Sequence, residues 1–275
     1  MTGYDAHLIA SEAGPLTAQI GVGSGPLVVF QHGLCGDAAQ PAEVFPGSKG
    51  FRHAVLNCRG HGGSPLGATD DLSIATFADD VARLVTTLPT PPVAVGGISM
   101  GAAIALRLAV KRPDLVPALI LSRPAWVTEP APANMQPNAV AGAMLDLDLG
   151  LAAFEATQTA RDLAALAPDN LATLRGLFAR QPLPETAALL TRIAVDGPGV
   201  TEGELAALRL PVLILGTEQD FVHPMAHAAH LARLIPGATL IEIPPKGQNR
   251  AAHVAAMQTA ILGFLRGLID AAPQH

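Results

Sequence analysis

The chain carries a serine between two glycines in the stretch Gly97-Ile98-Ser99-Met100-Gly101. An apolar run, Pro92-Val93-Ala94-Val95-Gly96, precedes it, and an alanine-rich stretch typical of a helix follows it. In that setting the pattern predicts a sharp turn from a strand into a helix, with the Ser99 hydroxyl at the exposed tip. Glycines are needed on either side because a Cβ there would collide with neighbouring backbone. The turn also aims the first N–H groups of the helix at the space above Ser99, where a developing oxyanion needs donors.

Composition limits the class of protein. The chain has 275 residues, 49% hydrophobic and 15% charged, which predicts one large core with room for an insertion. A net charge of −6 gives no reason to expect nucleic acid or an anionic membrane as a partner. No secretory signal and no apolar stretch of membrane-spanning length is visible, and Cys35 and Cys58 are the only cysteines. We therefore expect a cytoplasmic protein without a membrane span, and the oligomeric state stays open, a homo-oligomer included.

Strand-like and helical runs alternate over most of the chain, which predicts a mostly parallel eight-stranded sheet with helices on both faces. Residues 126–205 differ, because their helical periodicity is broken by prolines and includes no convincing strand. We interpret them as an all-helical cap inserted after the sixth strand, over the carboxyl ends of the strands. The predicted domains are a core of residues 1–125 and 206–275 and a cap of residues 126–205. Two short strands flank Gly14-Pro15, and the others are expected near 26–30, 52–57, 92–96, 116–121, 211–215 and 239–243.

Two further motifs carry a resemblance to a known family. Gln31-His32-Gly33-Leu34-Cys35-Gly36 follows the third predicted strand, and Arg59-Gly60-His61-Gly62-Gly63-Ser64 follows the fourth. Together with the Ser99 turn, they resemble the oxyanion loop and the glycine-rich turn of α/β-hydrolase-fold proteins, and the resemblance covers nearly the whole chain. It implies that the amides of Leu34 and Met100 hold an oxyanion. It implies structural roles for the imidazoles of His32 and His61, and neither a cofactor nor a metal.

The resemblance also identifies an acid and shows one departure from the family. Asp220 lies four residues before Pro224, where the family places the carboxylate that orients its histidine. The family's base follows the eighth strand as a Gly-His pair, about 17 residues before an aromatic-Leu pair. Counting back from Phe264-Leu265 gives Gln248 in place of that histidine. Glutamine cannot accept the serine proton near neutral pH.

Two other histidines could replace the missing base. His223 lies three residues after Asp220, and His253 lies five residues after Gln248 in the first turn of the final helix. Each also has a structural interpretation, since His223 could cap the helix that opens at Pro224 and His253 could be a half-buried helix residue. A chain without any histidine base is the third alternative.

The substrate pocket is expected to be apolar because the cap is rich in Met, Leu and Phe and offers no basic cluster. The leading hypothesis is a serine hydrolase that cleaves a small or medium apolar ester or lactone through an acyl-enzyme on Ser99. The alternatives are a cofactor-free proton-transfer or C–C bond enzyme on the same fold, and a small-ligand binding protein without catalysis. Besides the catalytic and oxyanion groups, the expected pocket residues are His32, Gly33, Trp126, Phe221 and Val222.

Overall fold

The computed structural model describes residues 3–46 and 50–271. Eight strands form one sheet in the order β1-β2-β4-β3-β5-β6-β7-β8. β2 pairs antiparallel with both β1 and β4, and all other neighbours are parallel, so the predicted mostly parallel eight-stranded sheet is confirmed. The strands are β1 (Tyr4–Ile9), β2 (Leu16–Gly21), β3 (Leu27–Gln31), β4 (Arg52–Leu56), β5 (Ala94–Ile98), β6 (Leu119–Ser122), β7 (Val212–Gly216) and β8 (Thr239–Glu242).

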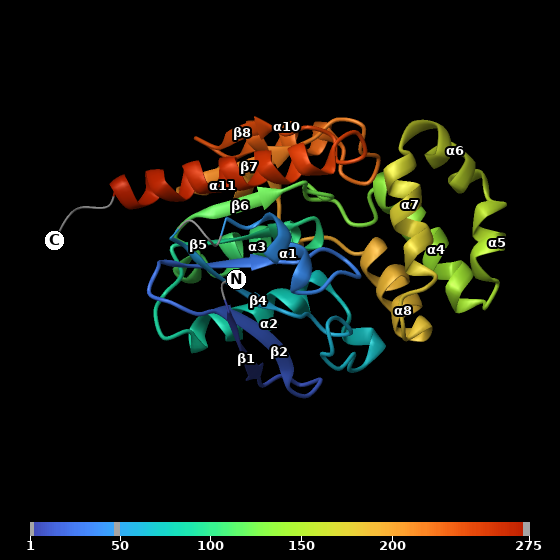
Figure 1. Ribbon diagram of the computed structural model, residues 1–275, viewed down its shortest axis with the longest axis horizontal. Helices are drawn as coiled ribbons and strands as arrows, with labels where there is room; N and C mark the ends of the chain where they lie inside the picture. The colour runs from blue at the N-terminus through green and yellow to red at the C-terminus, as the bar shows by residue number, and fades with distance from the viewer. Residues whose placement is uncertain (1–2, 47–49, 272–275) are drawn as a thin grey trace.

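Helices cover both faces of the sheet, as Figure 1 shows. Successive residues of β3 point to opposite faces, so Leu27 and Val29 belong to one apolar cluster and Val28 and Phe30 to the other. Burial on both faces explains why the central strands are nearly continuous apolar runs. The first cluster includes residues of α2 (Ile74–Thr87), α3 (Met100–Lys111) and α10 (Met225–Leu234), and the second includes residues of α1 (Ala39–Val44) and α11 (Arg250–Ala271).

The chain between β6 and β7 is helical and has an apolar cluster of its own. Figure 1 shows α4 to α8 gathered at the end of the molecule toward which the β6 arrow points. Since the carboxyl ends of parallel strands meet at that edge, the insertion stands next to the turn that carries Ser99. The last helix of the segment, α9, packs against α10 of the core rather than with the others. The predicted division at 126–205 stays a prediction. The helices are α4 (Gln136–Asp146), α5 (Gly150–Glu155), α6 (Gln158–Leu166), α7 (Pro168–Leu177), α8 (Leu183–Ala194) and α9 (Glu202–Ala206).

Helix α11 is long and apolar enough to cross a membrane, judged by length and composition alone, with a mean hydropathy of 1.3. The sequence predicts no membrane span, and length and composition are the only properties by which α11 qualifies as one. It buries His253, Met257, Ile261 and Leu265, one residue per turn, and three of these four belong to the apolar cluster on one face of the sheet. Packing of this kind is typical of a helix that covers a sheet.

Candidate active site

Ser99 lies at a strained turn between β5 and α3. Its backbone has φ 56° and ψ −111°, a conformation that residues other than glycine rarely adopt. The glycines on either side are required by close backbone contacts: a Cβ on Gly97 would lie 2.6 Å from the carbonyl carbon of Gly101, and a Cβ on Gly101 would lie 2.5 Å from the Gln31 oxygen. The turn therefore holds the Ser99 hydroxyl at the carboxyl edge of the sheet.

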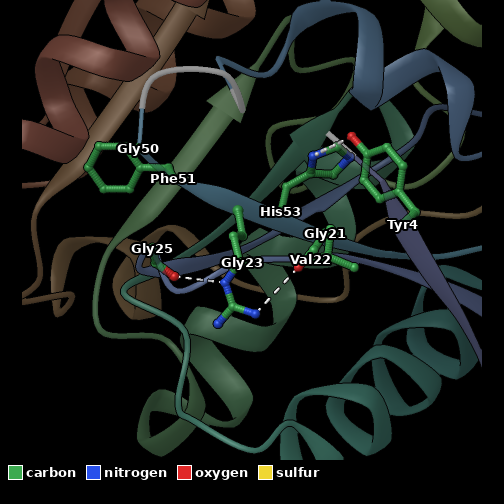
Figure 2. A pocket seen from close by; sticks show the side chains of 9 residues that line it. Tyr4, Gly21, Val22, Gly23, Gly25, Gly50, Phe51 and His53 are labelled. Carbon is green, nitrogen blue, oxygen red and sulfur yellow. Dashed lines mark hydrogen bonds between the residues drawn. The ribbon is translucent and has the colours of Figure 1, made fainter. Parts of the chain in front are cut away.

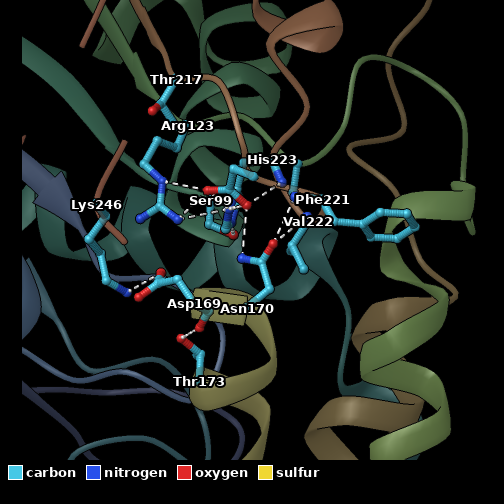
Figure 3. Close-up of polar contacts among 12 residues, drawn as sticks. Ser99, Arg123, Asp169, Asn170, Thr173, Thr217, Phe221, Val222, His223 and Lys246 are labelled. Atoms are coloured by element: carbon cyan, nitrogen blue, oxygen red, sulfur yellow. Dashed lines mark hydrogen bonds and ion pairs between the residues drawn. The ribbon is translucent and has the colours of Figure 1, made fainter. Parts of the chain in front are cut away.

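His223 reaches this hydroxyl from the loop between β7 and α10 (Figure 3), and Asp220 belongs to the same loop. The Nε2 atom of His223 is 2.8 Å from Ser99 Oγ, and its Nδ1 atom is 3.0 Å from each carboxylate oxygen of Asp220. The His223 backbone N–H also donates to Asp220 Oδ1 at 3.0 Å. A serine, a histidine and an aspartate thus form one continuous chain of hydrogen bonds, with the last two only three residues apart.

Arg123, directly after β6, pairs with the same carboxylate. Its Nε and Nη2 atoms donate to Asp220 Oδ2 at 3.1 and 2.5 Å, and Nη2 also lies 3.1 Å from His223 Nδ1. Nδ1 thus faces two carboxylate oxygens and one guanidinium nitrogen, and that nitrogen already donates to Asp220 at a shorter distance. The two oxygens therefore favour the proton on Nδ1, which is donated to Asp220. The Nε2 atom then carries the lone pair that accepts the hydrogen bond from Ser99.

Burial and charge set the protonation of this group. Burial lowers the pKa of His223 below its ordinary 6.5; Asp220 opposes this shift and Arg123 adds to it. Burial alone would raise the pKa of Asp220, but His223 and Arg123, through charge and hydrogen bonds, hold it well below its usual range. At neutral pH the imidazole is therefore neutral and the carboxylate is ionised.

The helical insertion contributes Asn170, from the first turn of α7, to the same group. Its Nδ2 donates to Asp220 Oδ1 at 2.9 Å, and its Oδ1 accepts from the backbone N–H of Phe221 at 2.7 Å. The Asn170 side chain is buried and bridges the insertion to the Asp220 loop. Neither Asn170 nor Arg123 was predicted from sequence. The position of Arg123 at the carboxyl end of a parallel strand was the one available signal.

Comparisons with known proteins agree with this architecture. Residues 26–190 match the model of the alpha/beta hydrolase fold family. The chain belongs to that family. The Magnesium-chelatase 30 kDa subunit of Rhodobacter capsulatus is 28% identical over 276 residues, covering 90% of this chain and 89% of that protein. The 2-(acetamidomethylene)succinate hydrolase of Mesorhizobium japonicum is 27% identical over 231 residues, covering 81% of each. Among solved structures, a thermophilic esterase from Thermogutta terrifontis shares the fold, with a TM-score of 0.70, 23% identity and coverage of 96% of this chain and 99% of the other.

Of the two expected oxyanion donors, Leu34 lines the same cavity as Ser99, and Met100 directly follows Ser99 in the chain. Within residues 3–46 and 50–271, neither the Leu34 nor the Met100 backbone N–H donates a hydrogen bond to the protein. Met100 is the first residue of α3, where a helix leaves its N–H groups without an intrahelical acceptor. The backbone N–H of Gly33, one residue before Leu34, donates to Gln40 Oε1 at 2.6 Å.

The alternative histidine and the departure from the family lie elsewhere. His253 is buried on α11, and its Nδ1 donates to the Pro244 carbonyl at 2.7 Å. No hydrogen bond joins His253 to Ser99 or Asp220 in the part of the chain that the structure describes. Gln248 is exposed and donates to the Gln219 side chain at 2.9 Å. The structure thus places His223, and not His253, against Ser99.

Three expected pocket residues do not line the cavity at Ser99. His32 is fully buried between the Gly33 carbonyl and the Cys58 N–H, and burial lowers its pKa to about 4. Trp126 is buried and donates from its indole to the Asp196 carbonyl at 2.9 Å. Phe221 is 38% exposed, and Figure 3 shows its ring directed away from Ser99. A position next to a motif in the sequence was therefore not enough to identify the residues that line the cavity.

The cavity at Ser99, of about 100 Å³, is not the apolar pocket expected from composition. Lys246 lines it and forms an ion pair with Asp169 at 3.0 Å, between the loop after β8 and the insertion. Its lining combines charged, amide and apolar side chains: Gly33, Leu34, Gln40, Ile98, Ser99, Arg123, Met135, Asn138, Asn170, Thr173, Leu174, Leu177, Val222, His223 and Lys246. Of the five expected pocket residues, Gly33 and Val222 line this cavity.

A second cavity, of about 130 Å³, lies at the other edge of the sheet, where β3 and β4 begin (Figure 2). Its wall includes Tyr4, whose hydroxyl is 3.3 Å from His53 Nδ1, and Arg52, which donates to the carbonyls of Gly25 and Gly21. It brings no serine or cysteine next to a base. No cluster of His, Cys, Asp or Glu suited to a metal ion occurs among residues 3–46 and 50–271.

Proposed function

We propose that the protein is a serine hydrolase that cleaves a small or medium carboxylic ester or lactone. The observation that supports it is the hydrogen bond of 2.8 Å between Ser99 Oγ and His223 Nε2, continued from Nδ1 to Asp220. A nucleophile, a base and an orienting carboxylate in contact are the requirements for acyl transfer through serine.

The proposed reaction uses each of these groups in turn. Ser99 Oγ attacks the substrate carbonyl carbon as its proton passes to His223 Nε2, and the Leu34 and Met100 N–H groups stabilise the oxyanion. Collapse of the intermediate expels the alkoxide, which takes the proton from His223 and leaves an acyl-enzyme. Water, deprotonated by the same imidazole, then releases the acid and restores Ser99. Loss of one oxyanion donor typically costs about 10²–10³ in rate.

Arg123 and Asn170 act on this reaction through Asp220. Together they occupy both carboxylate oxygens, so the carboxylate can accept from Nδ1 in one orientation only. Because Asn170 belongs to α7, the insertion acts as a cap that completes the support of the acid. Both are positioning residues rather than groups that touch the reacting atoms.

One of the two relatives supports a hydrolase. The relative from Mesorhizobium japonicum is named as a hydrolase, and this chain covers 81% of it. A cavity of about 100 Å³ next to Ser99 is suited to a small acyl or lactone group.

The test combines a fluorophosphonate probe with a panel of p-nitrophenyl esters. We expect covalent labelling and ester turnover in the wild type, both abolished in Ser99→Ala. His223→Gln should lose several powers of ten in kcat, as expected for loss of the base. His253→Gln is the matched control and should keep most of the activity. Turnover that survives Ser99→Ala would refute the acyl-enzyme, and equal losses in the two histidine variants would refute the assignment of His223.

A further inference from the structure

Asn138, on α4, lines the cavity at Ser99 with a side chain that folding leaves unsatisfied. It is 8% exposed, and its Oδ1 has no hydrogen-bond partner among the residues that the structure describes. The two other buried asparagines of the insertion are engaged. Asn134 donates to the carbonyls of Ala125 and Val222, and Asn170 bridges to the Asp220 loop.

The surroundings of Asn138 make this amide costly for the fold. Met135, just before α4, is an apolar neighbour in the cavity wall, and α7 contributes Leu174 and Leu177 together with Asn170 and Thr173. Leucine, which has the same number and branching of side-chain heavy atoms as asparagine but a larger volume, would line such a wall without burying an unpaired acceptor. A buried oxygen without a donor lowers stability, and one that faces a cavity gains its partner when a ligand supplies an N–H or O–H.

A second amide lines the same cavity. Gln40 is held through its Oε1, which accepts from Gly33, while its Nε2 makes no hydrogen bond in the described part of the chain. Two residues of the cavity wall therefore hold an unpaired amide atom, an acceptor on Asn138 and a donor on Gln40. A secondary amide, with one N–H and one carbonyl, complements both.

We propose that Asn138 is a specificity-determining residue that accepts a hydrogen bond from the substrate, and that the preferred substrates are esters whose acyl group carries an acylamino group. The inference rests on the proposed hydrolase function and replaces the expectation of an apolar ester or lactone. An ester that lacks the donor leaves Asn138 unpaired in the complex and is discriminated against.

The test uses pairs of p-nitrophenyl esters that differ only in N–H against CH₂. N-acetylglycinate is compared with 4-oxopentanoate, and N-acetyl-β-alaninate with 5-oxohexanoate, so that two spacings are covered. We expect wild-type kcat/KM, corrected for spontaneous hydrolysis, to favour the N–H member of at least one pair by about tenfold or more. Asn138→Leu should abolish that preference, by lowering kcat/KM for the N–H esters much more than for the keto esters. Asn134→Leu, which removes a buried asparagine engaged with backbone, is the control: it should slow both members alike and leave the ratio unchanged.

The outcomes separate the two proposals. Ser99-dependent turnover of all four esters without a preference, or a preference that survives Asn138→Leu, overturns the role of Asn138 alone. Absence of Ser99-dependent turnover overturns the hydrolase. In that case calorimetric titration with the methyl esters of N-acetylglycine and 4-oxopentanoic acid decides on Asn138, since only the first carries an N–H donor and only the first should bind more weakly to Asn138→Leu.

Discussion

Asp220→Asn replaces one acceptor oxygen by an NH₂ group in an environment composed of donors. Arg123 donates two hydrogen bonds to Asp220, Asn170 Nδ2 donates at 2.9 Å, and the His223 backbone N–H donates at 3.0 Å. The introduced NH₂ finds an acceptor only in the Nδ1 lone pair of His223. That contact requires the imidazole proton on Nε2, which then donates to Ser99 instead of accepting from it. We expect kcat to fall about 10⁴-fold, the loss typical of a triad held in the wrong tautomer.

The same substitution removes the counter-charge of Arg123, whose side chain is only 10% exposed. Breaking a buried ion pair from one side costs about 3–5 kcal/mol of unfolding free energy. Adding Arg123→Met should recover much of that stability, because no charge is then left unpaired, while kcat stays low.

Urea unfolding and single-turnover hydrolysis of a p-nitrophenyl ester measure the two effects of Asp220→Asn separately. Asp169→Asn is the control, since its partly exposed ion pair contributes about 1 kcal/mol or less and should leave kcat nearly unchanged. A folded Asp220→Asn protein that keeps kcat within about tenfold of wild type, against the expected 10⁴, would refute the orienting role of the carboxylate.

Three further results are expected. Gly101→Ala should destabilise the fold by about 1–3 kcal/mol in urea unfolding, because its Cβ would lie 2.5 Å from the rigid Gln31 carbonyl oxygen; an unchanged midpoint would contradict that geometry. Asn170→Ala should lower kcat more than it raises KM in steady-state assays, since the residue supports Asp220 and not the substrate. The rate should follow the neutral form of His223, whose pKa lies below 6.5, so kcat/KM should stay constant from pH 8 to neutral and fall only at lower pH; a pH profile with its midpoint above 7 would be inconsistent with the buried imidazole.

Local patterns made much of the fold predictable. The eight strands and the elbow at Ser99 follow from apolar runs, turn residues and glycines that act over a few positions. Asp220 and His223 could be proposed together because they lie three residues apart in one loop after β7. The choice between His223 and His253 could not be made from sequence, because it depends on where each ring points.

The residues that surround this group were not predictable from spacing. Arg123 and Asp220 are 97 positions apart, and Asn170 and Asp220 are 50 apart, so no local rule connects them. The prediction of an apolar pocket was wrong for a related reason. Composition describes the cap as a whole, whereas the cavity is lined by the few side chains that face inward, among them Asn138 and Lys246.

The sequence by itself determined the succession of strands and helices along the chain and the turn that exposes Ser99, because these depend on the periodicity of apolar residues and on the positions of glycines. The tertiary structure alone decided that His223 meets Ser99 while His253 turns to the Pro244 carbonyl. It also decided that an arginine and an asparagine of the helical insertion hold Asp220, and that an asparagine with an unpaired oxygen lines the cavity. Those outcomes depend on how segments that are distant in sequence pack at the carboxyl edge of the sheet. The separation of two residues along the chain does not give their distance in space.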